Sequence, residues 1–141
     1  MGDYSGSDMP IATPGDSAEA SLSITESAID AYAELTGDDN PIHVDDEYAA
    51  ETFFGGRVAH GMFTAGAVSA ALADLPGDVV YLSQDLSFEN PVRPGQTVTA
   101  TVTVVEQLDD DRLRVETAAR TDEEQVLSGE AVVMSLPHRS E

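Results

Sequence analysis

The second half of the chain alternates between apolar and polar residues in long, regular segments. Residues 97–104 read Thr-Val-Thr-Ala-Thr-Val-Thr-Val, which places every second side chain on one face of a strand and the others in water. Residues 112–119 repeat the alternation, and the acidic run at residues 109–111 predicts a hairpin turn between the two segments. Residues 79–88 and 125–136 predict two further strands. Such a chain is expected to build an antiparallel sheet with one buried face.

A helix made largely of small residues precedes these strands. It is predicted from about Gly61 to about Leu75 and ends at Pro76 and Gly77. Alanine and glycine lie on so many of its faces that other elements must approach it closely. A helix of this kind followed by long antiparallel strands predicts an α+β fold, with the helix buried against a strongly curved sheet. The pattern leaves the strand order open.

The first half of the chain predicts shorter elements. Residues 1–18 are rich in Gly, Ser, Pro and Asp and are expected to form a flexible tail. A short strand at residues 21–24 leads to a helix that is capped by Thr25 and ends at Gly37. Asp45 or Asp46 is expected to cap a further short helix. Because 141 residues suit one domain, residues 19–137 are predicted to form it, with a C-terminal tail at 138–141.

The charge of the chain excludes several classes of partner. Six Arg and no Lys stand against 27 acidic residues, so the net charge is −21. A surface of this kind repels nucleic acid and anionic membranes. With 41% hydrophobic residues, the chain is nevertheless too apolar to be a disordered acidic protein. An acidic surface without Lys on a normally patterned core is typical of a cytosol rich in salt. The absence of Cys excludes disulfides and thiolate chemistry, and the absence of an apolar membrane run or signal sequence favours a cytoplasmic location.

We expect the melting temperature of the protein to rise with KCl concentration. At about 1 M salt the Debye length is only about 3 Å, so repulsion among surface carboxylates is largely screened, whereas at low salt it acts against the fold. Thermal unfolding followed by circular dichroism between dilute and molar KCl measures the effect. A melting temperature that stays flat over this range would contradict an adaptation to high salt.

The segment Asp38-Asp39-Asn40-Pro41-Ile42-His43 places a carboxylate and an imidazole five residues apart. Gly37 ends the preceding helix and Pro41 keeps Asn40 extended, so a compact turn can aim Asp38 and His43 into one pocket. Two such groups can hold a water and act as general acid and base. Spacing alone also allows Asp38 to be a simple turn residue and His43 a surface residue. Asp39 is expected to point away.

A second segment, His60-Gly61-Met62, lies at the predicted start of the small-residue helix. Free N–H groups and the positive end of the helix dipole lie there, and Gly61 lets a substrate carbonyl approach the backbone. This arrangement can form an oxyanion hole. Alternatively, Gly61 only permits a tight start of the helix. His60 is expected to position or pack. The sequence contains no metal-ligand spacing, so no metal is expected. It also contains no serine-hydrolase motif.

Taken together, these segments resemble the MaoC-like family of (R)-specific enoyl-CoA hydratases. The resemblance covers most of residues 22–135. It centres on the D-x-N-P-x-H pattern at residues 38–43, on Phe54, and on V-A-H-G-M at residues 58–62. Residues 88–95 match the family's F-x-x-P-V-x-x-G element, although Gln96 follows where the family often has Asp.

The resemblance implies a hot-dog fold, in which a curved sheet wraps a central helix, and a homodimer with the acyl pocket near the subunit interface. It implies that Asp38 and His43 activate a water that adds to C3 of a trans-2-enoyl-CoA and supply the proton for C2. The Gly61 N–H would polarise the thioester. Coenzyme A is part of the substrate, so no separate cofactor is expected. Ser69 would line the active site, although as a helix residue it could equally serve packing. Asn40, which also stabilises the turn, and Met62 would contact substrate.

The polyanionic coenzyme A needs cations, and two arginines lie near the motifs. Arg57 and Arg93 are candidates for phosphate contacts, with a simple surface role as the alternative for each. Other readings of the chain are a hydratase or dehydratase of a branched or dicarboxylic acyl-CoA, a hot-dog thioesterase, and an acyl-binding subunit with an inert pocket. The Asp-His spacing argues against the thioesterase. Acyl chain length and pathway, whether polyester (polyhydroxyalkanoate) precursor supply or fatty-acid metabolism, do not follow from the sequence.

Overall fold

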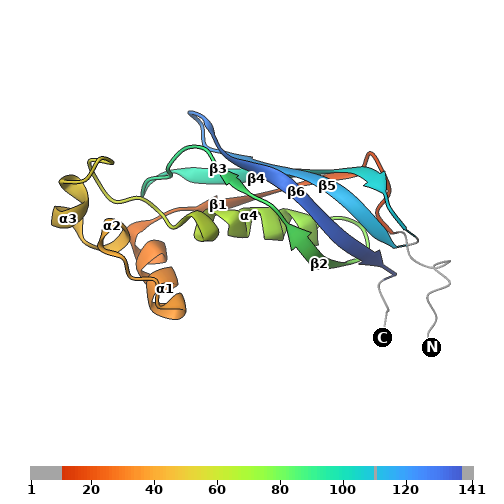
Figure 1. Ribbon diagram of the computed structural model, residues 1–141, viewed down its shortest axis with the longest axis horizontal. Coiled ribbons are helices and arrows are strands. Elements are labelled where there is room, and N and C mark those ends of the chain that lie inside the picture. Colours follow the sequence, from red (N-terminus) through yellow and green to blue (C-terminus); the bar gives the residue numbers. More distant parts are fainter. Residues whose placement is uncertain (1–10, 110, 138–141) are drawn as a thin grey trace.

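The computed structural model describes residues 11–109 and 111–137, which form one curved antiparallel sheet and four helices (Figure 1). Neighbouring strands follow the order β1-β4-β5-β6-β2, and β3 pairs with β6. The strands are β1 (Ser17–Ser23), β2 (Asp78–Gln84), β3 (Ser87–Phe88), β4 (Thr97–Gln107), β5 (Arg112–Arg120) and β6 (Gln125–Leu136). The helices are α1 (Glu26–Thr36), α2 (Pro41–Val44), α3 (Asp46–Ala50) and α4 (Gly61–Ala73).

Helix α4 lies along the inner face of the sheet and contacts β1, β2, β4 and β5 (Figure 1). Its side chains at Val68, Ala71 and Leu72 are almost completely buried. They pack into one core with the inward residues of the strands, among them Val98, Val102, Val115 and Val133. Burying this apolar surface is the main stabilising contribution to the fold. The predicted α+β class and the hot-dog arrangement of a helix wrapped by a curved sheet are confirmed.

The alternating segments form strands as predicted. In β5, Leu113, Val115, Thr117 and Ala119 are buried, while the residues between them are partly or fully exposed. One prediction was wrong: residues 79–88 do not form a single strand. Regular pairing with β6 stops after Gln84, because the Glu130 N–H of β6 donates to the side chain of Asp85 (3.0 Å). The Asp85 N–H in turn donates to the Glu130 carbonyl (3.0 Å).

The N-terminal boundary of the domain lies earlier than predicted. Strand β1 begins at Ser17 and pairs with β4, and Ala12 is 2% exposed, with its N–H donating to the Ser135 hydroxyl at 2.9 Å. A predicted tail extending to residue 18 is therefore too long, because residues 12–18 are held by the C-terminal strand and by β4. Residues 1–10 and 138–141 lie outside the described part of the chain.

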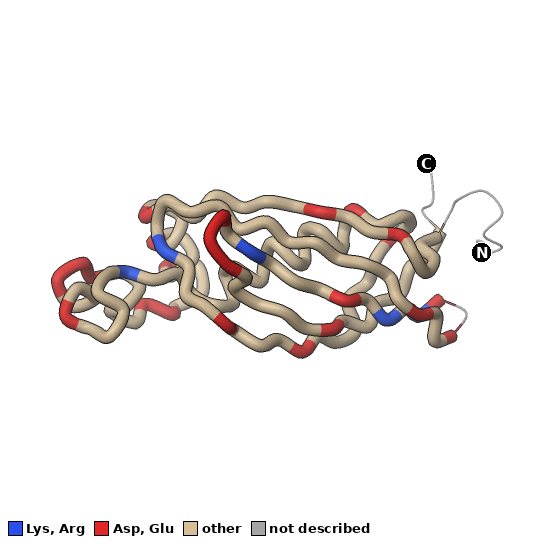
Figure 2. The backbone as a smooth tube through the Cα atoms, turned by 90° about the horizontal axis from the view of Figure 1, so that it is seen from above, with Lys and Arg blue, Asp and Glu red and all other residues tan. Residues whose placement is uncertain are grey.

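Helix α1 begins and ends as its sequence predicts. The Thr25 side chain accepts a hydrogen bond from the Ala28 N–H at 3.0 Å, and Gly37 adopts the left-handed conformation (φ 82°) that closes the helix. Asp45 caps α3. None of the helices in the described residues is long and apolar enough to cross a membrane. Acidic positions are spread over the strands and loops of the backbone, and basic ones are few (Figure 2).

Candidate active site

The two sequence segments singled out above meet in one pocket of about 570 Å³. Its wall includes Asp38, His43, His60, Gly61 and Met62. The pocket is also lined by Phe54 and by residues 88–92, which begin at the last residue of β3. Asp39 and Asn40 do not line it, so of the two adjacent carboxylates only Asp38 faces the pocket.

The turn that carries Asp38 and His43 is built by local hydrogen bonds. The Thr36 hydroxyl accepts from the Asp38 N–H at 3.2 Å, and the Asn40 side chain accepts from the Ile42 N–H at 3.4 Å. Pro41 then opens the one-turn helix α2, whose first position suits proline because its missing N–H would have no partner there. This short helix, with Asn40 as its cap, turns the His43 ring back towards Asp38.

Hydrogen bonding fixes the tautomer of His43. Its Nδ1 lies 2.7 Å from the carbonyl oxygen of Val58, and because a carbonyl can only accept, Nδ1 carries the proton. In the neutral ring, Nε2 therefore keeps its lone pair, which can accept a proton from a water. The residue is only 9% exposed, so the ring has little freedom to turn.

His60 supports the other end of the turn. Its Nε2 donates to the main-chain carbonyl of Asp38 at 2.8 Å, and the ring stacks on His43 with centroids 3.8 Å apart. Tyr32 covers the His60 ring with a centroid distance of 4.7 Å. His60 Nδ1 is buried and has no hydrogen-bond partner among the described residues. The expectation that His60 is a positioning or packing residue agrees with these contacts.

The arrangement suits a bound water better than a metal ion. One carboxylate oxygen of Asp38 and one nitrogen each of His43 and His60 lie within 4.8 Å of one another, close enough for a shared ligand. The two rings are stacked, however, with 26° between their planes. In-plane lone pairs of two stacked rings do not converge on one ion, as metal coordination would require. Asp38 and His43 can instead hold one water between them.

Gly61 begins α4 and faces the same pocket. No side chain among the described residues caps this helix, so the N–H groups of Gly61 and Met62 are available to an external acceptor at the positive end of the dipole, whereas that of Phe63 donates to the His60 carbonyl. A Cβ added at Gly61 would lie 2.8 Å from Phe88 Cε1, which leaves no room for a side chain without moving that ring. Glycine therefore lets the Phe88 ring pack directly against the start of α4, at the wall of the pocket.

A second groove, of about 560 Å³, runs beside the first and contains Ser69 on its wall. Met62 and Phe88 line both spaces, while Leu82 and Leu86 make the second one apolar. Burial raises the pKa of Tyr81 at this groove. In the first pocket, hydrogen bonds from Ser128 and Gln125 hold the pKa of Glu89 below its usual value, so Glu89 keeps a negative charge at the pocket wall.

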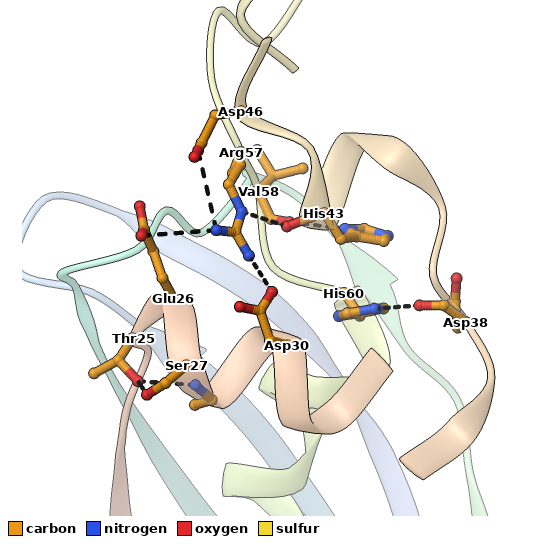
Figure 3. A network of polar contacts seen from close by, with 11 residues as sticks. Thr25, Glu26, Ser27, Asp30, Asp38, His43, Asp46, Arg57, Val58 and His60 are labelled. Carbon is orange, nitrogen blue, oxygen red and sulfur yellow. Dashed lines mark hydrogen bonds and ion pairs between the residues drawn. The ribbon is translucent and has the colours of Figure 1, made fainter. Parts of the chain in front are cut away.

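The two arginines differ in position. Arg93 is partly exposed and donates through Nη2 to the Phe54 carbonyl at 2.6 Å. Arg57 is buried, and its guanidinium lies among the carboxylates of Glu26, Asp30 and Asp46 (Figure 3). Neither lines the pocket. For Arg57 this position does not favour a phosphate contact, because its donors face Asp30 and the main chain of His43.

Comparison with known proteins agrees with the site. The family described as MaoC like domain matches residues 11–126, which include both motif segments and the residues after β3. The chain belongs to the MaoC-like family.

Relatives within the MaoC-like family and solved structures support this placement. The chain is 45% identical over 121 residues to a 3-hydroxybutyryl-CoA dehydratase of Methylorubrum extorquens, covering 84% of this chain and 76% of the relative. It is 44% identical to an (R)-specific enoyl-CoA hydratase of Rhodospirillum rubrum, covering 85% of each. The structure of an R-hydratase from Pseudomonas aeruginosa superposes with a TM-score of 0.81 and 37% identity, covering 92% of this chain and 88% of that one.

Sequence reasoning missed the contacts that hold the MaoC-like motif in place. The role of the Val58 carbonyl cannot be predicted from the sequence, because every residue has a main-chain carbonyl. The ion pair between Arg57 and Asp30 joins residues 27 positions apart, a separation at which no local sequence pattern indicates a contact. The one sequence feature that pointed to a role for Arg57 was its position next to the V-A-H-G-M segment of a strongly acidic chain. That feature is equally consistent with a phosphate contact and with a structural ion pair.

Proposed function

We propose that this protein is an (R)-specific enoyl-CoA hydratase, which adds water to a trans-2-enoyl-CoA to give the (R)-3-hydroxyacyl-CoA. The observation that carries the proposal is the single pocket lined by Asp38, His43 and the N-terminus of α4 at Gly61. The names of the Rhodospirillum and Pseudomonas relatives support it. The name of the Methylorubrum relative describes the loss of water, which is the same reaction in reverse.

The geometry suggests how the pair acts. Asp38 and His43 hold the water, and His43 Nε2 is free to accept a proton because Nδ1 is bonded to Val58. The oxygen of the water bonds to C3 of the enoyl group, and the pair returns a proton to C2 on the same face. Negative charge that develops on the thioester oxygen is stabilised by the Gly61 N–H and the dipole of α4.

Three further residues are proposed to bind the substrate, and a fourth is proposed to support the site. Met62 and Ser69 line the two adjoining spaces and would contact the acyl chain. Arg93, partly exposed beside the pocket-lining residue Val92, would reach a phosphate of coenzyme A. Asn40 would act at one remove, by holding the turn, since its side chain accepts from the Ile42 N–H.

A second copy of the chain is proposed to complete the enzyme as a homodimer. Strand β2 lies at one end of the sheet, and its consecutive residues Val80, Tyr81 and Leu82 are 43%, 42% and 43% exposed. Such an edge invites pairing with another strand. Pairing of two β2 strands would continue the sheet and cover the groove that contains Ser69. A molar mass of one chain by light scattering at molar KCl would exclude this assembly.

A panel of trans-2-enoyl-CoA esters of increasing chain length, assayed at molar KCl, tests the activity. We expect the enone absorbance to fall without release of free thiol, and the product to have the (R) configuration. Thiol release would indicate a thioesterase. Failure to turn over any ester would favour a non-catalytic acyl-binding protein. The same panel measures chain-length preference and so bears on whether the product suits polyester formation.

A further inference from the structure

Arg57 is the most deeply buried charged side chain among the described residues near the site, with 6% of the side chain exposed. Its Nη2 donates to Asp30 of α1 at 2.6 Å. Its Nη1 lies 3.7 Å from a carboxylate oxygen of Glu26 and 4.0 Å from one of Asp46 (Figure 3). A buried cation is costly unless it is paired, and here carboxylates from α1 and α3 converge on it.

The third nitrogen of this guanidinium, Nε, contacts the main chain of the candidate active site. Arg57 Nε donates to the main-chain carbonyl of His43 at 2.6 Å. One planar group thus ties the backbone of His43 to Asp30 on α1. Only arginine presents donors in several fixed directions; a lysine nitrogen could keep the ion pair with Asp30 or the bond to the carbonyl, but not both in this geometry.

The neighbours of Arg57 act on the same turn. The Val58 carbonyl accepts from His43 Nδ1 at 2.7 Å, and the Val58 N–H donates to the Ile42 carbonyl at 3.2 Å. His60 Nε2 holds the Asp38 carbonyl at 2.8 Å. Residues 57–60 therefore fix both ends of the turn, and Arg57 is the part of this segment that links His43 to the helices behind it (Figure 3).

We propose that Arg57 is a positioning residue for the hydration reaction, acting through the backbone of His43 and not through the phosphates of coenzyme A. The inference rests on the proposed function. Its physical basis is that His43 Nε2 must meet a water at hydrogen-bond distance, and a displacement of about 1 Å in such a group can cost about 10²-fold in rate. The carboxylates around Arg57 keep the guanidinium in place and leave it no open face towards the pocket.

The test compares Arg57→Lys with the wild-type protein on two substrates, crotonyl-CoA and crotonyl-pantetheine, which lacks the nucleotide phosphates. We expect kcat to fall at least about tenfold with both substrates, while KM changes little and alike for both. A rise in KM for the CoA ester alone would show a phosphate contact and overturn the proposal. Glu26→Gln is the matched control, because Glu26 is 60% exposed and 3.7 Å from the guanidinium.

Asp30→Ala is a second test of the proposal, which remains available if Arg57→Lys does not fold. The Asp30 side chain is 57% exposed, so its removal loosens Arg57 without opening the core. We expect a kcat below that of Glu26→Gln and a lower melting temperature, because the buried guanidinium loses a carboxylate 2.6 Å away. Both variants are therefore compared at a temperature where circular dichroism shows each to be folded. An active wild-type protein with full kcat in both Arg57→Lys and Asp30→Ala would overturn the positioning role alone. An inactive wild-type protein would overturn the proposed function and this inference with it.

Discussion

Replacing Asp38 by Asn should lower the kcat of enoyl-CoA hydration by about 10²–10⁴-fold, the range that general acid/base catalysis typically contributes. Asn has the same shape but can neither take up nor release a proton at neutral pH. The turn should survive, because among the described residues Asp38 holds it through main-chain groups, with its N–H bonded to Thr36 and its carbonyl to His60. Steady-state kinetics with crotonyl-CoA measure the loss, and the melting temperature reports the fold.

His43→Gln should cause a loss of similar size for the same reason. Asp39→Asn is the matched control for both variants, because Asp39 carries the same charge one position further on and does not line the pocket. We expect it to retain most of the activity. Near-normal turnover in purified Asp38→Asn or His43→Gln would contradict the assignment of this pair as the acid and base.

Gly61→Ala should lower kcat/KM by about 10²-fold, the lower end of the cost of losing one oxyanion-hole donor. The N–H group remains in this variant, but the new Cβ would lie 2.8 Å from Phe88 Cε1 and narrow the approach to it. Phe88 is 53% exposed, so its ring can move aside and the variant should keep close to the stability of the wild-type protein. A loss of activity would then come from the pocket and not from the fold.

The double variant Gly61→Ala with Phe88→Ala separates two causes of that loss. If the displaced Phe88 ring blocks the pocket, removing it should restore much of the activity relative to Phe88→Ala alone. If activity stays low, the methyl group itself keeps the thioester from the backbone. Unchanged kcat/KM in Gly61→Ala would contradict a close approach of the substrate carbonyl at this position.

Local patterns predicted most of the fold. The alternation in β4 and β5, the Thr25 cap and the Gly37 end of α1 depend on neighbouring residues, so the sequence shows them directly. The division between β2 and β3 depends on β6, some 45 residues later, where a Cβ at Gly129 would lie 1.9 Å from the Asp85 carbonyl oxygen. The early start of the domain likewise depends on Ser135, which accepts from the Ala12 N–H. Contacts at this separation leave no periodic pattern.

The candidate site divides in the same way. Asp38, His43 and Gly61 were singled out by turn and helix-start signals together with a family resemblance, and one pocket brings them together. Of the residues that hold them, Asn40 and His60 were predicted to have a supporting role, whereas the contacts of Val58 and Arg57 with His43 were not predicted. The phosphate contact expected of Arg57 followed from counting scarce positive charges, whereas its position depends on Asp30 and Glu26, which face it only after α1 has packed against the turn.

The way Asp38 is held has an evolutionary consequence. Its main-chain groups secure the turn, and its carboxylate is left for chemistry, so folding and catalysis make separate demands on this position. One substitution at residue 38 would leave a folded protein with an intact thioester pocket and a much slower reaction. After gene duplication, a copy changed in this way could continue as a carrier or a regulatory subunit beside its active counterpart, without any repair elsewhere in the chain.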